Sequence, residues 1–137
     1  MLTSLDQAEK KSIKPLARVV SWASVGVDPS LMGLGPIGAV REAIKKAKWN
    51  LDEVDLFEIN EAFAVVPMAT MSELNIHHSK VNIRGGACAL GHPIGASGAR
   101  IVVTPVHAMI RERCSKGIAS ICIGGGEAMA IAIELSD

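Results

Sequence analysis

The sequence lacks an excess of one charge, a long apolar run and a closely spaced cysteine pair. Fourteen Lys and Arg residues balance fourteen Asp and Glu residues, and neither sign forms a long block, which argues against nucleic acid as a partner. No stretch reaches the roughly 18 continuous apolar residues of a membrane span, and residues 1–12 lack the apolar core of a signal peptide. We therefore expect a soluble protein without a membrane partner. We expect a cytoplasmic location, with a mitochondrial or peroxisomal address left open.

The cysteines are also few, and their pattern argues against disulfides and metal. Three cysteines without a CxxC pair fit a reducing compartment in which thiols stay free. A metal site built from His77, His78, Cys88 and His92 is one alternative. However, adjacent histidines are typical of a solvated loop, and nothing here has zinc-finger spacing. We expect no metal and no bound cofactor.

Apolar residues make up 49% of the 137 positions, which is enough for one ordinary core. Their periodicity predicts an alternation of strands and helices in the order βαβαβαββ, preceded by a connector helix within residues 1–14. The predicted strands are 16–27, 54–59, 81–83, 117–123 and 128–135, and the predicted helices are 36 to about 47, 60 to about 74, and about 97 to 113. This order favours an α/β domain over residues 1–137, with a mixed five-stranded sheet and helices packed on it.

Two prolines conflict with these predicted helices. Pro67 and Pro105 both fall well past the first turn, where proline costs roughly 3 kcal/mol through a lost hydrogen bond and a steric clash. Either both helices kink at these positions, or the predicted boundaries are wrong.

The segment GLGPIG, at 33–38, matches the G-x-G-x-x-G dinucleotide fingerprint, and Asp52, Glu53 and Asp55 follow about twenty residues later. The fingerprint should directly follow a strand, but DPSLM intervenes here. In addition, Pro36 removes a backbone N–H that would face the pyrophosphate. The pattern therefore favours a loop and helix N-terminus built from glycine and proline.

A second glycine-rich segment, GHPIGASG at 91–98, lacks the Lys-Ser/Thr ending of a phosphate-binding P-loop. Its glycines suit either a sharp turn or a loop pressed against a ligand. His92 favours the second interpretation, because an imidazole held between glycine and proline is both fixed and accessible, as a proton donor or base should be.

Two further motifs allow a structural and a catalytic interpretation. In CIGGGE, at 122–127, Cys122 is either a small buried side chain before a turn or an acid/base beside amides that stabilise an oxyanion. In NEAF, at 60–63, Asn60 and Glu61 stand where a strand meets a helix, so they either face a cleft or cap the helix.

Three motifs, NEAF at 60–63, GGACALGHPIGASGAR at 85–100 and CIGGG at 122–126, together resemble the carboxy-terminal half of thiolases. These acyl-CoA acyltransferases make or cleave 3-ketoacyl-CoA in lipid metabolism. The likeness extends over nearly the whole chain, including LARVVSW, and is closest to the acetyl-CoA acetyltransferase branch. It implies a thiolase-like half domain.

The resemblance implies a role for each matching residue. His92 would help to activate a nucleophile and donate to the thioester oxygen, while Asn60 would hold a water that completes this oxyanion hole. Cys122 would exchange the α-proton, and the amide of Gly124 would contribute to a second oxyanion hole. Preorganised donors and a base are needed together because an enolate must form from a weakly acidic thioester.

For substrate binding, the resemblance implies that Met32 and Phe63 line the acyl and pantetheine region. The sequence also departs from the family pattern. Cys88 stands where an aliphatic residue is usual, and Glu127 and Ala128 follow the glycines where other residue types are common. An unpaired Glu127 would raise the pKa of Cys122.

The family's nucleophilic cysteine lies in an amino-terminal half, and nothing in this chain matches its motif. We therefore expect the carboxy-terminal part of an enzyme that acts on acyl-CoA together with such a half. The alternative is a non-catalytic module for acyl-CoA or lipid binding, or for assembly. The expected partners are acyl-CoA and either a thiolase amino-terminal half or a second copy in a homodimer, which would cover an exposed apolar face.

Overall fold

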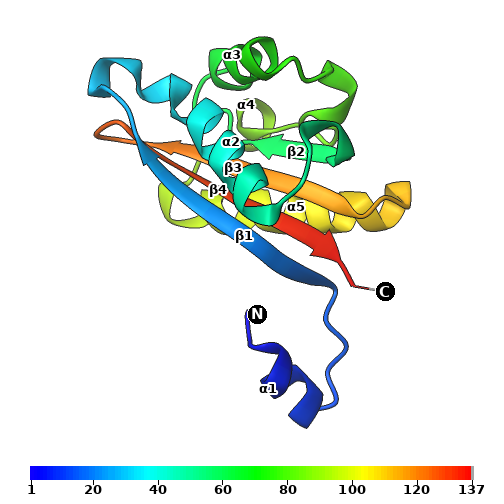
Figure 1. Ribbon diagram of the computed structural model, residues 1–137. Helices are drawn as coiled ribbons and strands as arrows, with labels where there is room; N and C mark the ends of the chain where they lie inside the picture. The colour runs from blue at the N-terminus through cyan, green and yellow to red at the C-terminus, as the bar shows by residue number, and fades with distance from the viewer. Residues whose placement is uncertain (137) are drawn as a thin grey trace.

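The computed structural model describes residues 1–136 as a four-stranded mixed sheet with helices on both faces (Figure 1). The strands are β1 (Ala17–Gly26), β2 (Leu56–Ile59), β3 (Lys116–Ile123) and β4 (Glu127–Leu135). The helices are α1 (Leu5–Lys10), α2 (Gly35–Ala47), α3 (Val65–Leu74), α4 (Ala87–Leu90) and α5 (Ile94–Glu112), with short 3-10 helices η1 (Pro29–Leu34), η2 (Leu51–Glu53) and η3 (His78–Lys80). The predicted α/β class is confirmed.

The sheet has the order β1-β4-β3-β2. Strand β4 runs antiparallel to both of its neighbours, and β2 pairs with β3 in parallel. The predicted turn at Gly124 is confirmed, because residues 124–126 connect β3 to β4 directly. The parallel pair matters for the site, since β2 and β3 end at the same edge of the sheet.

Alternate residues of the strands build two cores, one on each face of the sheet. Ile118 faces α2 and packs in the cluster that contains Val40, while Ala119 faces α5 and packs in the cluster that contains Met109. All four are at most 1% exposed. Burying a large side chain such as Ile118 or Met109 contributes about 1.5–3 kcal/mol, so α2 and α5 are both firmly attached to the sheet.

The glycine and proline segment before α2 has a structural explanation. Gly35 is the first residue of α2, and Pro36 lies in its first turn, where a missing N–H costs nothing. A Cβ on Gly35 would approach the Ala128 Cβ to 2.7 Å, so glycine allows the helix to pack closely against β4. The sequence predicted a helix start here. The close packing of Gly35 explains the glycines of GLGPIG without nucleotide binding.

The predicted strand at 81–83 is wrong, and the sheet therefore has four strands, not five. Val81 makes a single isolated bridge with Phe57. Asn82 then takes a left-handed conformation with φ of 49°, which interrupts any strand. Its side-chain amide bonds the backbone of Ile59 instead, accepting from its N–H at 2.8 Å and donating to its carbonyl at 2.9 Å. The Asn82 side chain thus makes hydrogen bonds to β2 that the backbone of a neighbouring strand would otherwise make.

The two prolines have different outcomes. Helix α3 begins at Val65 instead of residue 60, so Pro67 lies in its first turn and the predicted boundary was wrong. Pro105 does lie inside α5, which begins three residues earlier than predicted, and its ring is fully buried. No helix within residues 1–136 is long and apolar enough to cross a membrane.

Candidate active site

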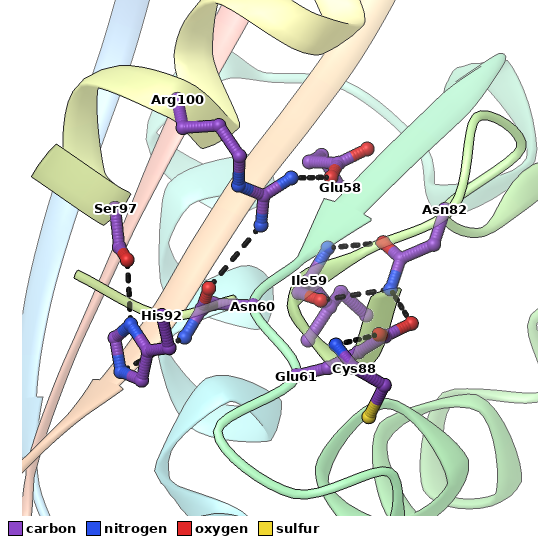
Figure 2. Close-up of polar contacts among 9 residues, drawn as sticks. All are labelled: Glu58, Ile59, Asn60, Glu61, Asn82, Cys88, His92, Ser97 and Arg100. Atoms are coloured by element: carbon purple, nitrogen blue, oxygen red, sulfur yellow. Dashed lines mark hydrogen bonds and ion pairs between the residues drawn. The ribbon is translucent and has the colours of Figure 1, made fainter. Parts of the chain in front are cut away.

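The site residues gather at the end of β2 and around the loop that leads into α5 (Figure 2). Asn60 directly follows β2 and is completely buried. Its backbone N–H donates to the Ser120 carbonyl of β3 at 2.9 Å, which continues the parallel pairing by one residue. The sheet itself therefore fixes Asn60, and the helix-cap alternative does not apply, because α3 begins five residues later.

His92 occupies the short connection between α4 and α5. Gly91, with φ of 87°, makes a turn that other residues rarely adopt, and Pro93 is the N-cap of α5. The His92 Nδ1 atom lies 2.5 Å from the Ser97 hydroxyl, which itself donates to the Pro93 carbonyl at 3.1 Å. The imidazole is therefore held in place on an exposed loop, as the sequence predicts.

The structure brings His92 and Asn60 together. His92 Nε2 lies 3.3 Å from Asn60 Nδ2, although the two residues are 32 positions apart in the chain. A hydrogen-bond donor and an imidazole nitrogen thus face the same edge of the sheet. Such a pair can bind a carbonyl oxygen and exchange a proton beside it.

A largely buried ion pair between Arg100 and Glu58 lies next to this contact (Figure 2). Arg100 of α5 donates through Nη1 to Glu58 Oε1 at 2.5 Å and through Nη2 to Asn60 Oδ1 at 3.2 Å. Glu58 is only 3% exposed. Burial raises the pKa of Glu58, and the Arg100 guanidinium offsets part of that rise. Sequence reasoning missed both residues.

Glu61 caps the helix that precedes His92. Its carboxylate accepts from the Cys88 backbone N–H and from Asn82 Nδ2, each at 2.9 Å. Burial alone would raise the pKa of Glu61, but these hydrogen bonds outweigh it and hold the pKa below its usual value. A Cβ on Gly86 would come within 2.4 Å of the Glu61 carboxyl carbon, so glycine makes room for this cap. Glu61 is thus a helix cap, but it caps α4 and not the helix α3 that follows NEAF in the chain.

Cys122 lies near the end of β3, in the core cluster under α2, and is 6% exposed. Burial raises the pKa of its thiol, and Glu127 makes no contribution to the rise. The reason is the strand alternation: Cys122 pairs with Ala128, so Glu127 faces away from it. Among residues 1–136, no hydrogen bond joins Cys122 to His92 or Asn60.

The remaining predicted site residues differ in exposure. Gly124 lies in the β3–β4 turn, with open space where a Cβ would be. Phe63 is 65% exposed in the loop before α3. Met32, in η1, is half-buried and packs against the core. Among the hydrogen bonds of residues 1–136, none joins these three residues to His92, and their roles stay predictions.

The alternative metal site is not assembled. His77 Nδ1 bonds the Ser79 hydroxyl at 2.7 Å, while His92 bonds Ser97 and Asn60. The part of the chain that the structure describes holds no cluster of three or more His, Cys, Asp or Glu side chains able to bind a metal ion.

Comparison with known proteins gives a consistent result. The family described as "Thiolase, C-terminal domain" matches residues 13–135. The chain is 53% identical over 134 residues to the cytosolic acetyl-CoA acetyltransferase of Mus musculus, covering 98% of this chain and 34% of the mouse protein. It is 50% identical over 133 residues to an acetyl-CoA acetyltransferase of Pseudomonas aeruginosa, again covering 34% of that protein.

Solved structures show the same likeness. The crystal structure of the Bacillus anthracis acetyl-CoA acetyltransferase superposes with a TM-score of 0.94 and 46% identity, over 98% of this chain and 34% of that one. The human mitochondrial 3-ketoacyl-CoA thiolase in complex with CoA superposes with a TM-score of 0.95 and 44% identity, with the same coverage. The chain thus spans about a third of the length of the relatives it matches.

Proposed function

We propose that this chain, which belongs to the thiolase family and corresponds to its C-terminal domain, supplies the acid–base and oxyanion-binding part of an acyl-CoA acyltransferase site. The activity we propose is that named for its relatives, acetyl-CoA acetyltransferase. The observation that carries the proposal is the contact between His92 and Asn60 at the end of β2, 3.3 Å apart.

In the cleavage direction, a nucleophilic thiol attacks the 3-keto carbonyl of the acyl-CoA. His92 Nε2 accepts the thiol proton, and the resulting imidazolium becomes a hydrogen-bond donor. The bond between the α and β carbons then breaks, and its electron pair forms the enolate of the departing thioester. His92 and a water held by Asn60 stabilise the enolate oxygen, because donors placed in advance at developing charge lower the barrier.

The enolate carbon then needs a proton, and Cys122 is the residue we propose to supply it. Burial raises the pKa of this thiol, so it is protonated at neutral pH and able to donate. In the condensation direction the same sulfur takes the α-proton. The amide of Gly124, without a side chain to shield it, stabilises the oxyanion that forms at the acylated nucleophile.

We propose that the nucleophile comes from another chain or segment. A reactive cysteine needs a lowered pKa, because the thiolate is the attacking form. Burial raises the pKa of Cys88, Cys114 and Cys122, with nearby carboxylates adding to the rise at Cys88 and Cys114. The partner we propose is therefore a segment like the remaining two thirds or so of the mouse relative.

We propose a cytosolic location, because the mouse relative is named as cytosolic. Another relative is named as mitochondrial, so family membership alone leaves the compartment open. Fractionation of cells expressing the tagged protein tests the proposal, and recovery with mitochondria would contradict it.

The function is tested by mixing the purified chain with the unmatched part of the mouse relative, acetoacetyl-CoA and CoA. We expect loss of the 3-ketoacyl thioester only in the mixture, and a drop of about 10²–10⁴-fold in His92→Ala, the range for removing a general acid or base. His107→Ala, on the exposed side of α5, is the matched control. A stable complex that binds acyl-CoA without turnover would favour the non-catalytic alternative.

A further inference from the structure

We propose that Arg100, anchored by Glu58, is a positioning residue that fixes the tautomer of His92 through the side-chain amide of Asn60 (Figure 2). The inference rests on the proposed function, in which His92 and Asn60 face the acyl thioester. It adds two residues that touch neither the substrate nor the imidazole.

The first step is the orientation of the Asn60 amide. A guanidinium can only donate hydrogen bonds, so the Asn60 atom that faces Arg100 Nη2 at 3.2 Å must be the carbonyl oxygen. The NH₂ group then faces His92. Because an amide nitrogen can only donate, His92 Nε2 must accept at this contact and carries a lone pair. The proton of the neutral imidazole therefore lies on Nδ1.

The other side of the ring gives the same assignment independently. The Ser97 hydroxyl has a single proton and donates it to the Pro93 carbonyl at 3.1 Å. Towards His92 Nδ1, 2.5 Å away, the hydroxyl oxygen must then accept. Nδ1 is the donor, and Ser97 and Arg100 bias the ring in the same direction.

The second step is the anchoring of Arg100. Its planar fork reaches Glu58 with one nitrogen and Asn60 with another, a geometry that a lysine ammonium cannot reproduce. The Arg100 side chain is 20% exposed and that of Glu58 is 4% exposed. Within residues 1–136, Arg100 Nε is buried without a hydrogen-bond partner. The guanidinium is thus held by hydrogen bonds at its two terminal nitrogens, while Nε is left without a partner.

This tautomer matters for the reaction. With the proton on Nδ1, Nε2 carries the lone pair, which accepts from the Asn60 amide in this structure and can take the proton of a nucleophile that replaces this contact. The other tautomer would point an N–H at the Asn60 NH₂ group, placing two donors against each other. Arg100 therefore selects the form of His92 that can act as a base.

The test is a measurement of the imidazole tautomer by long-range ¹H–¹⁵N correlation NMR on the ¹⁵N-labelled 137-residue chain, at a pH where the ring is neutral. A His92→Gln variant assigns the signals. We expect the Nδ1–H pattern in the wild-type chain and a clear shift towards the Nε2–H pattern in Arg100→Lys. Arg84→Lys is the matched control, because Arg84 pairs with Glu112 on the surface.

The proposal is overturned by an Nε2–H pattern in the wild-type chain, or by an unchanged pattern in folded Arg100→Lys. If Arg100→Lys does not fold, Asn60→Asp decides the matter, since it keeps the Glu58 ion pair and replaces a donor by an acceptor. We expect the proton to move to Nε2 in Asn60→Asp, and an unmoved proton overturns the proposal. No acyl-CoA enters these measurements, so the expected tautomer shifts without turnover in the mixing assay would contradict the proposed function alone.

Discussion

Two carboxylates at the end of β2 show how strongly the surroundings of a single residue decide its chemistry. Glu58 is buried under α5, and burial raises its pKa although Arg100 is close. Glu61 is three positions further on, and hydrogen bonds from Cys88 and Asn82 outweigh its burial and lower its pKa. Glu58 supports the site by pairing with Arg100, and Glu61 supports it by capping α4.

The lowered pKa of Glu61 predicts a pH dependence of stability. The folded state binds this proton less readily than the unfolded state, so the stabilisation is fully present above the usual glutamate pKa of about 4.3 and is lost as the pH falls through the lower folded value. We expect the unfolding free energy of the wild-type chain to fall more steeply than that of Glu61→Gln below about pH 4.3. Urea denaturation at several pH values measures this. Glu112→Gln, on the surface, serves as control, and parallel curves for the wild-type chain and Glu61→Gln would refute the prediction.

Residues of the site were predictable only where their signal is local. His92 and Asn60 stand in short motifs, so sequence reasoning found both. The role of Arg100 depends on a partner 42 positions away in Glu58, and no local pattern carries that information. Asn82 was missed for the same reason, because its side chain bonds the backbone of Ile59, which lies 23 positions earlier in the chain.

The same division between local and distant causes holds for whole elements. Strand β1 and helix α2 follow from alternation, helical spacing and a proline in the first turn, and both were predicted within one or two residues. The false strand at 81–83 has the right composition, but the left-handed conformation of Asn82 ends it. The late start of α3 has a tertiary cause too, since residue 60 continues the parallel pairing with β3.

At two glycines, we expect an added methyl group to have opposite effects on stability. Gly126, in the β3–β4 turn, has φ of 89°, and its Cβ would lie 2.2 Å from the Val27 carbonyl oxygen. Gly98, in α5, has open space around it. We expect Gly126→Ala to lose at least about 1–2 kcal/mol of stability, and Gly98→Ala to gain about 0.5–1 kcal/mol from its helical preference. Urea denaturation of both variants checks this; no loss in Gly126→Ala would contradict the first argument, and a loss in Gly98→Ala would contradict the second.

At the scale of the whole molecule, α5 covers only part of its face of the sheet. It packs mainly on β2 and β3. Trp22 of β1 lies opposite Ile131, and Met129 of β4 lies opposite Ser24, which places all four on this face. Trp22 is 64% exposed and Met129 is 43% exposed. The open part of the sheet therefore presents apolar side chains that would be buried against another chain or segment.

In the isolated chain, a second copy is the available partner for this face, and we expect a homodimer whose population rises with concentration in sedimentation equilibrium. Truncating a large interface aromatic typically costs more than 1 kcal/mol of binding, so Trp22→Ser should weaken the dimer by about tenfold. Leu2→Ser is the control, since Leu2 is 84% exposed but precedes the sheet. If the partner proposed above covers the same face, adding the unmatched part of the mouse relative should displace the dimer. A monomer at every concentration, or a dimer insensitive to Trp22→Ser, would place any self-association elsewhere on the molecule.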